Sequence, residues 1–203
     1  MKNTFRTLML TLVAFVSFTA IASAQTSPAT ATGISIKNFG QMTENLYRGA
    51  QPTESDYKAL ADFGIKTIVD LRNDEESFAR SSAEAAGLKY VNIPMDGVSA
   101  PSDADVAQFL KVVNDPASGK VYFHCKAGIH RTGTMGAVYR INHDGWDYDK
   151  AYAEMKNYQF SAGLFHGALK SFVKRYAQQS APARAAITSK VAFNAAVSPA
   201  LAH

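Results

Sequence analysis

One segment of the chain constrains its fold more than any other. The only cysteine, Cys125, follows an apolar run, and Arg131 follows the cysteine six residues later. Gly128 lies midway between them, and Thr132 begins an apolar pattern with helical spacing. A strand that enters a tight loop and then a helix turns several backbone N–H groups toward one point, where they bind an anion. The segment therefore predicts a strand–loop–helix unit built around a phosphate-sized anion.

The same segment carries the residues of a nucleophilic reaction. A lone cysteine forms no intramolecular disulfide, so Cys125 is either an inert buried thiol or a reactive one. A helix N-terminus and a neighbouring guanidinium favour the thiolate, which predicts Cys125 as a nucleophile that attacks phosphorus. Arg131 is always charged and can bind two phosphate oxygens in a fork. The backbone and side chains between and beside them are the predicted substrate-binding groups: Lys126, Ala127, Gly128, Ile129, His130 and Thr132. The hydroxyl of Thr132 either donates to the sulfur or caps the helix.

A general acid is required on a separate loop, because an expelled alkoxide needs a proton. Asp96 is the best candidate, since it follows the predicted strand 89–95 in a loop that contains Gly97. Asp103 and Asp105 compete with it. They follow Ser102 at a predicted helix start, where acidic residues are common for capping alone.

Several other conspicuous side chains are predicted to be structural. His124 is expected to orient the loop through hydrogen bonds rather than to transfer protons. Arg48 and Arg72 are either further phosphate contacts or ion-pair partners, and the second use is favoured. Packing between helices is expected for the remaining group, which consists of Trp146, Phe160, Phe165 and His166.

Elements of two kinds alternate along the chain. Strands are predicted at 45–48, 65–71, 89–95 and 120–124, and helices at 53–63, 75–86, from 102, and at 132–143, 148–158 and 163–178. Thr53 with Asp56, and Ser102 with Asp105, have capping-box spacing. This alternation predicts a single α/β domain with a central, mainly parallel sheet flanked by helices, and ligands at the carboxyl ends of the strands.

The two ends of the chain differ in composition from this domain. Residues 1–24 have a short basic start, an apolar run and the small-residue pattern Ala22-Ser23-Ala24, which predicts a cleaved signal peptide rather than a membrane anchor. Residues 25–40 are interpreted as a flexible lead, 41–180 as the catalytic domain, and 181–203 as an Ala-rich, disordered tail. The expected location is therefore exported, periplasmic or secreted from a bacterium, without a membrane anchor after cleavage.

The net charge and the composition limit the classes of partner that the chain can bind. Signal cleavage would remove two of the 21 Lys and Arg residues and none of the 17 Asp and Glu residues, leaving a net charge of about +2. Such a balance, without a basic stripe, argues against a nucleic-acid partner. Neither a cofactor nor a metal ion is expected, and the oligomeric state is left open.

The segment His124-Cys125 through Arg131-Thr132-Gly133 resembles the signature of the cysteine-dependent protein tyrosine and dual-specificity phosphatases. Residues 46–52, 65–72 and 140–146 extend the resemblance to a small bacterial and plant-fungal dual-specificity-like group, covering about 44–160. The resemblance implies a tyrosine-phosphatase-like fold, with Cys125 as nucleophile, Arg131 as phosphate ligand and Asp96 as acid. In some members the acid lies slightly later, where this chain has Val98.

The predicted function is hydrolysis of phosphomonoesters through a cysteinyl-phosphate intermediate, on phosphotyrosine, phosphoserine or phosphothreonine proteins or similar phosphoesters. The Lys126 and His130 positions are similar to those of phosphatases that cleave inositol pyrophosphates, and Cys-Lys-Ala-Gly is similar to tensin-type phosphoinositide phosphatases. An inositol (pyro)phosphate or phosphoinositide phosphatase is therefore an alternative. Less favoured rivals are a rhodanese-like sulfurtransferase and a phosphate-binding module without activity.

Overall fold

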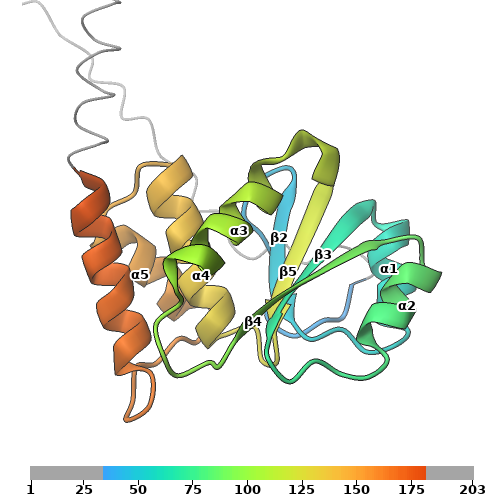
Figure 1. The fold of residues 1–203 in the computed structure, drawn as a ribbon, viewed down its shortest axis with the longest axis horizontal. Coiled ribbons are helices and arrows are strands. Elements are labelled where there is room, and N and C mark those ends of the chain that lie inside the picture. Colours follow the sequence, from blue (N-terminus) through green and yellow to red (C-terminus); the bar gives the residue numbers. More distant parts are fainter. Residues whose placement is uncertain (1–33, 182–203) are drawn as a thin grey trace, which may run out of the picture.

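The computed structural model describes residues 34–181. The predicted signal peptide, the first part of the predicted lead and almost all of the predicted tail lie outside these residues. Within them the chain folds into the elements drawn in Figure 1. The strands are β1 (Gly40–Gln41), β2 (Leu46–Ala50), β3 (Ile65–Arg72), β4 (Lys89–Met95) and β5 (Lys120–Cys125). The helices are α1 (Asp56–Asp62), α2 (Ala79–Ala85), α3 (Asp103–Asn114), the 3₁₀ turn η1 (Pro116–Ser118), α4 (His130–His143) and α5 (Tyr148–Asn157). Residues 167–181 form a further helix, called the C-terminal helix below.

The strands form one sheet in the order β1-β2-β5-β3-β4. The short β1 is antiparallel to β2, and the other neighbouring pairs are parallel. This arrangement confirms the predicted α/β fold with a mainly parallel sheet. Strand β5 lies in the centre, so Cys125, its last residue, pairs with Ala50 at the end of β2. The carboxyl ends of the parallel strands meet at this edge, which is where ligands bind in such sheets.

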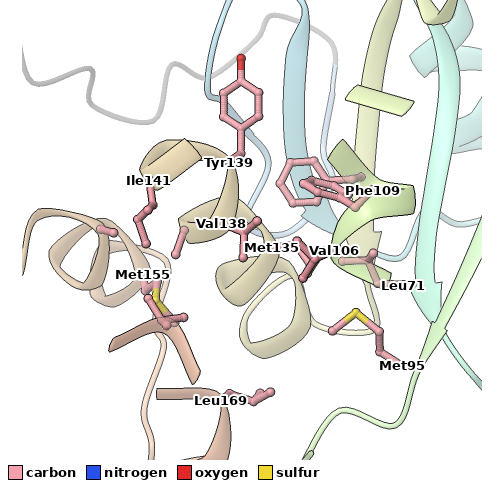
Figure 2. Packing of buried hydrophobic residues seen from close by; sticks show 14 of the residues in the cluster. Leu71, Met95, Val106, Phe109, Met135, Val138, Tyr139, Ile141, Met155 and Leu169 are labelled. Atoms are coloured by element: carbon pink, nitrogen blue, oxygen red, sulfur yellow. The ribbon is translucent and has the colours of Figure 1, made fainter. Parts of the chain in front are cut away.

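Helices cover both faces of the sheet (Figure 1). One face packs against α1 and α2, and the other against α3 and α4, with α5 and the C-terminal helix beyond. Successive residues of β5 point to opposite faces: Phe123 and Cys125 join the cluster with α3 and α4, and Tyr122 joins the cluster with α1 and α2. Figure 2 shows how side chains of α3, α4, α5 and the C-terminal helix meet in the larger cluster.

Helix α4 is buried on all sides through its middle. The ten residues from Thr132 to Ile141 are all buried. Gly136 makes room for a neighbour, because a Cβ at this position would lie 3.2 Å from Nη1 of Arg48. A helix enclosed in this way is fixed at its start by packing along its length, and that start adjoins the loop after Cys125.

Four helices begin at residues other than the predicted ones, and the last of these, the C-terminal helix, begins at residue 167 rather than 163. Helix α1 begins at Asp56 rather than Thr53, because the Asp56 carboxylate accepts hydrogen bonds from the N–H and hydroxyl of Thr53 and holds a turn there. Helix α2 begins at Ala79 rather than 75, since the Glu75 and Glu76 carboxylates accept hydrogen bonds from Tyr90 and Arg72 in the preceding loop. Helix α4 begins two residues early. The predicted capping box of Ser102 and Asp105 is present at α3.

The predicted flexible lead is corrected over its last residues. Residues 34–40 pack against the domain: Ile36 is 8% exposed, and the ring of Phe39 stacks on those of Tyr47 and Tyr122. Gly40 then begins β1. These apolar side chains pack against the sheet, Phe39 on β2 and on the central strand β5, so the packed domain begins before residue 41.

Candidate active site

Cys125 lies at the carboxyl end of the central strand, with only 3% of its surface exposed. Burial by itself would raise the pKa of its thiol. The hydroxyl and N–H of Thr132, the charge of Arg131 and the N–H of Gly128 outweigh that effect and hold the pKa below its ordinary value. The thiolate is therefore stabilised by groups that belong to the predicted loop.

The stretch from Cys125 to Arg131, called the Cys–Arg loop below, is packed tightly on the end of β2. Gly128 has a positive φ of 69°. A Cβ at this position would lie 2.5 Å from the carbonyl carbon of Gly49, so only glycine fits. The structure thus explains the glycine at the middle of the loop by both its backbone angle and its close contact with β2.

Arg131 joins the Cys–Arg loop to the ends of two other strands. Its Nη1 donates to the carbonyl of Met95 at 2.8 Å and to Oδ1 of Asn73 at 3.3 Å, and lies 3.8 Å from Oδ1 of Asp74. Asn73 and Asp74 were not predicted as site residues. Their position immediately after β3, at the edge where Cys125 lies, was the signal that could have found them. All of these contacts use Nη1 of Arg131. Nε and Nη2 take part in none of them, so they can bind two oxygens of an anion.

Asp96 follows β4 in the loop that leads to α3, and the next residue, Gly97, lies beside the guanidinium of Arg131. The carboxylate itself is exposed and accepts hydrogen bonds from the N–H groups of Val98 (2.8 Å) and Ser99 (2.7 Å). The hydrogen bond from the Ser99 side chain, followed by these N–H groups and by the charge of Arg131, lowers the pKa of Asp96. The structure therefore places Asp96 near the site but holds it as a carboxylate within its own loop. Asp105 is occupied in the capping box of α3.

The two basic side chains of the Cys–Arg loop have different surroundings. Lys126 is exposed. The His130 ring stacks on that of His166 with centroids 3.4 Å apart, and its Nε2 lies 3.2 Å from the carbonyl of Ser161. Burial, and then the charge of His166, lowers the pKa of His130. His130 is therefore a neutral packing residue at neutral pH, and Lys126 is the solvated cation of the loop. The side chain of Ile129 packs partly buried against the larger core cluster.

His124 lies behind the loop and is completely buried, and the prediction that it orients the loop through hydrogen bonds was wrong, because neither ring nitrogen has a hydrogen-bond partner within residues 34–181. Burial lowers its pKa to about 3, so the ring is neutral. Its Nδ1 lies 3.7 Å from Oδ1 of Asp70, the residue paired with it on β3. Asp70 in turn accepts a 2.7 Å hydrogen bond from Tyr90, and burial raises its pKa. This buried group was not recognised from the sequence, because an aspartate inside an apolar strand gives no periodic signal.

Arg48 and Arg72 are both buried, and they are held differently. Arg72 contacts Asp74 and Glu76 at 3.2 and 2.9 Å, as expected for an ion-pair partner. Arg48 has no carboxylate partner of this kind among residues 34–181. Its guanidinium lies 3.9 Å from the centre of the Tyr158 ring, and its Nη2 donates to the carbonyl of Gly128 at 3.1 Å.

Of the four residues predicted to pack between helices, some are buried and one is exposed. Phe160 is buried in the core, and Trp146 packs partly buried against the Arg140 guanidinium. Phe165 was predicted to pack between helices, and this was wrong: its side chain is 73% exposed on the turn before the C-terminal helix. His166 stacks on His130 at the rim of the Cys–Arg loop. Within residues 34–181, no three metal-ligating side chains gather in a group, and no helix is long and apolar enough to cross a membrane.

Comparison with known proteins places this geometry in a family. The family model described as "DSP-PTPase phosphatase fused to NAD+ Kinase" matches residues 16–174. The dual specificity protein phosphatase TpbA of Pseudomonas aeruginosa (strain UCBPP-PA14) is 32% identical over 139 residues, which is 68% of this chain and 62% of TpbA. The chain thus spans about 62% of the length of this relative.

Solved structures give the same result. A cysteine-to-serine variant of P. aeruginosa TpbA, in complex with phosphotyrosine, is 28% identical with a TM-score of 0.61, and the match covers 75% of this chain and 91% of that one. The catalytic core of the PP-IP phosphatase SIW14 from S. cerevisiae is 23% identical with a TM-score of 0.58, covering 71% of this chain and 93% of that one. The second similarity shows a shared fold.

Proposed function

The chain belongs to the family of cysteine-dependent, dual-specificity-type protein tyrosine phosphatases, and from that premise we propose that it hydrolyses phosphate monoesters through a cysteinyl-phosphate intermediate. The observation that carries the proposal is the state of Cys125. The thiol is almost fully buried, yet its pKa is lowered, by Thr132, Arg131 and the N–H of Gly128. A buried thiolate held beside an arginine is an activated nucleophile.

The first step transfers the phosphoryl group to sulfur. The Cys125 thiolate attacks phosphorus, an S–P bond forms, and the bond from phosphorus to the ester oxygen breaks. Nε and Nη2 of Arg131 bind two of the nonbridging oxygens, and the loop N–H groups stabilise the charge that spreads over them in the transition state. The departing oxygen takes a proton, which we assign to Asp96. Asp96 must first leave its hydrogen bonds to Val98 and Ser99 and become protonated.

The second step regenerates the enzyme. Water attacks phosphorus, the S–P bond breaks, and inorganic phosphate leaves while Cys125 returns to the thiolate. The hydroxyl of Thr132, which stabilises the thiolate, makes the sulfur a better leaving group in this step.

Phosphorylated proteins, phosphotyrosine above all, are the substrates we propose. The complex of the relative TpbA with phosphotyrosine supports this class. An inositol pyrophosphate or a phosphoinositide is the second candidate, since Lys126 is an exposed cation at the loop. His130 supports that candidate less, because its ring is stacked on His166 and its lowered pKa leaves it neutral.

A substrate panel tests the proposal. The mature chain should hydrolyse p-nitrophenyl phosphate, vanadate should inhibit it, and Cys125→Ser should abolish turnover. Phosphotyrosine and phosphoserine peptides, inositol polyphosphates and nucleotides should then be compared by kcat/KM. Thiosulfate:cyanide transfer without phosphatase activity would instead establish the sulfurtransferase rival. Phosphoester binding without turnover would establish the inactive binding module.

We also propose that the protein is exported, on the sequence of residues 1–24, which lie outside the described residues. A fusion of these 24 residues to a reporter that is active only after export should give activity, and replacing the apolar run by polar residues should remove it. Mature protein beginning at Gln25, identified by N-terminal sequencing, would support the cleavage site.

A further inference from the structure

The Cys–Arg loop is held from outside by one short stretch of chain, residues 38–51. Three consecutive carbonyls of the loop each accept a hydrogen bond from it: Lys126 from the N–H of Gln51 (3.2 Å), Ala127 from Nδ2 of Asn38 (2.9 Å) and Gly128 from Nη2 of Arg48 (3.1 Å). In a trans peptide, the carbonyl of one residue and the N–H of the next point in opposite directions. Carbonyls held outward therefore turn the N–H groups of residues 127–129 toward the inside of the loop.

The peptide between Ala127 and Gly128 shows this coupling directly. Its carbonyl accepts from Asn38, so its N–H points the opposite way, and this Gly128 N–H is one of the groups that lower the pKa of the Cys125 thiol. Asn38 is thus linked to the Cys125 thiol through one rigid peptide plane.

Asn38 is itself held in an unfavourable backbone conformation. Two non-glycine residues within 34–181 have positive φ, Asn38 at 56° and Gln159 at 68°. They are bonded to each other, because Nε2 of Gln159 donates to Oδ1 of Asn38 at 2.8 Å across 121 residues of sequence. This bond fixes the Asn38 amide with its nitrogen toward Ala127. Positive φ at two non-glycine residues costs free energy and persists where the surroundings enforce it, commonly at functional sites.

We infer that Asn38, oriented by Gln159, is a positioning residue of the active site: it sets the Ala127–Gly128 peptide so that its N–H points at the nucleophile and the bound phosphoryl group. The inference rests on the proposed phosphatase activity for its role in turnover. It assigns a task in the site to a part of the chain whose composition resembles a linker.

Asn38 allows a cleaner test than its neighbour Arg48. Arg48 is completely buried against Tyr158 and close to Gly136, so its replacement would disturb the core. Asn38 is half-buried, and its loss removes one hydrogen bond to the loop. The informative variants are Asn38→Ala, Asn38→Gly, which tolerates positive φ, and Asn38→Asp, which keeps the acceptor for Gln159 but has no donor for Ala127.

Two measurements on the mature protein separate positioning from mere stability. The rate of iodoacetamide alkylation as a function of pH gives the pKa of Cys125, and inhibition by orthovanadate reports the oxyanion site. For all three variants, the alkylation midpoint should move to higher pH and kcat/KM on p-nitrophenyl phosphate should fall about three- to tenfold, with Asn38→Asp most affected. Asn142→Ala is the matched control, since Nδ2 of Asn142 donates to the Tyr176 hydroxyl away from the site. It should leave both measurements unchanged.

The Asn38→Gly variant decides the matter. If Asn38 only maintained the local backbone, Asn38→Gly would keep wild-type alkylation and vanadate inhibition, and the inference would be overturned. The inference would also be overturned if the variants lost thermal stability while their alkylation midpoints and vanadate inhibition stayed at the wild-type values. If the wild-type chain does not hydrolyse p-nitrophenyl phosphate, the proposed function fails. The alkylation midpoints of the variants then still support or overturn the positioning role.

Discussion

Two loops meet at the carboxyl edge of the sheet, and they are held in opposite ways. The Cys–Arg loop is tied to its surroundings by donors from residues 38–51, and its proposed nucleophile, Cys125, is buried. The loop after β4, which carries Asp96, is exposed, and within residues 34–181 the Asp96 carboxylate accepts hydrogen bonds only from Val98 and Ser99 of the same loop. The site is thus built in advance for holding a phosphoryl group and stabilising the thiolate, whereas proton donation to the leaving group requires a rearrangement. Predictions about the two loops should differ accordingly.

The largest effect is expected at the nucleophile. Cys125→Ser should lower kcat/KM on p-nitrophenyl phosphate by at least about 10⁴-fold, because a serine hydroxyl is not ionised at neutral pH. Steady-state kinetics with purified protein measures this loss, and circular dichroism should show an unchanged fold. Residual activity within tenfold of the wild type would contradict the assignment of Cys125.

A smaller but still large loss is expected for Arg131→Lys, about 10²- to 10³-fold in kcat/KM. Lysine keeps the charge but has a single side-chain nitrogen. It therefore cannot bind two phosphate oxygens and also donate to the Met95 carbonyl, as Arg131 can with its three nitrogens. Vanadate inhibition should weaken in parallel. A variant with normal kcat and normal vanadate inhibition would show that the charge alone suffices.

For Asp96→Asn, the effect should depend on the substrate. On alkyl phosphates, whose leaving groups need a proton, kcat/KM should fall about 10²-fold, whereas p-nitrophenyl phosphate should be affected only a few-fold. Steady-state kinetics with an alkyl phosphate and with p-nitrophenyl phosphate, under identical conditions, measures this difference in kcat/KM. Loss in Asp103→Asn or Asp105→Asn instead would reassign the acid, and an equal loss on both substrates would show that Asp96 holds Arg131 rather than donating a proton.

The smallest effect is expected at Ser99, whose side chain is the main cause of the lowered pKa of Asp96. Ser99→Ala should raise that pKa, so the protonated carboxyl persists to higher pH. On alkyl phosphates, the falling limb of the pH–rate profile should therefore move to higher pH, with a few-fold gain in rate near neutrality. The rising limb belongs to the Cys125 thiolate, whose lowered pKa should stay in place. Movement of both limbs would contradict a separate role for the two loops.

The features that could be predicted from the sequence are those whose interacting residues are close together along the chain. The strand, loop and helix around Cys125 are contiguous, and the alternation of β5 and the capping box at Ser102 are local patterns. The hydrogen bonds that hold the Cys–Arg loop from outside are not local, since Asn38 lies 89 residues from Ala127 in the sequence. Strand β1 is only two residues long, too short for any periodicity. The preceding residues therefore resembled a linker, although they pack against the sheet.

Stacking of His130 on His166 escaped prediction for a similar reason. In the sequence, His130 precedes the predicted catalytic residue Arg131, and this position suggests a cation that binds the substrate. Its partner comes 36 positions later, on a turn whose path no local pattern fixes. The same turn leaves Phe165 exposed, where helical spacing alone would bury it.

The strand order has a consequence for how the protein is made. Strand β5, the last strand among residues 34–181, is the only link in the described sheet between β2 and β3. Until residues 120–125 emerge from the ribosome, β2 and β3 have no shared partner and each presents an unpaired edge. Assembly of the sheet must therefore wait for long-range pairing, which slows folding and prolongs exposure of those edges. Because Cys125 ends this same strand, a chain interrupted before it lacks both the central strand of the sheet and the proposed nucleophile.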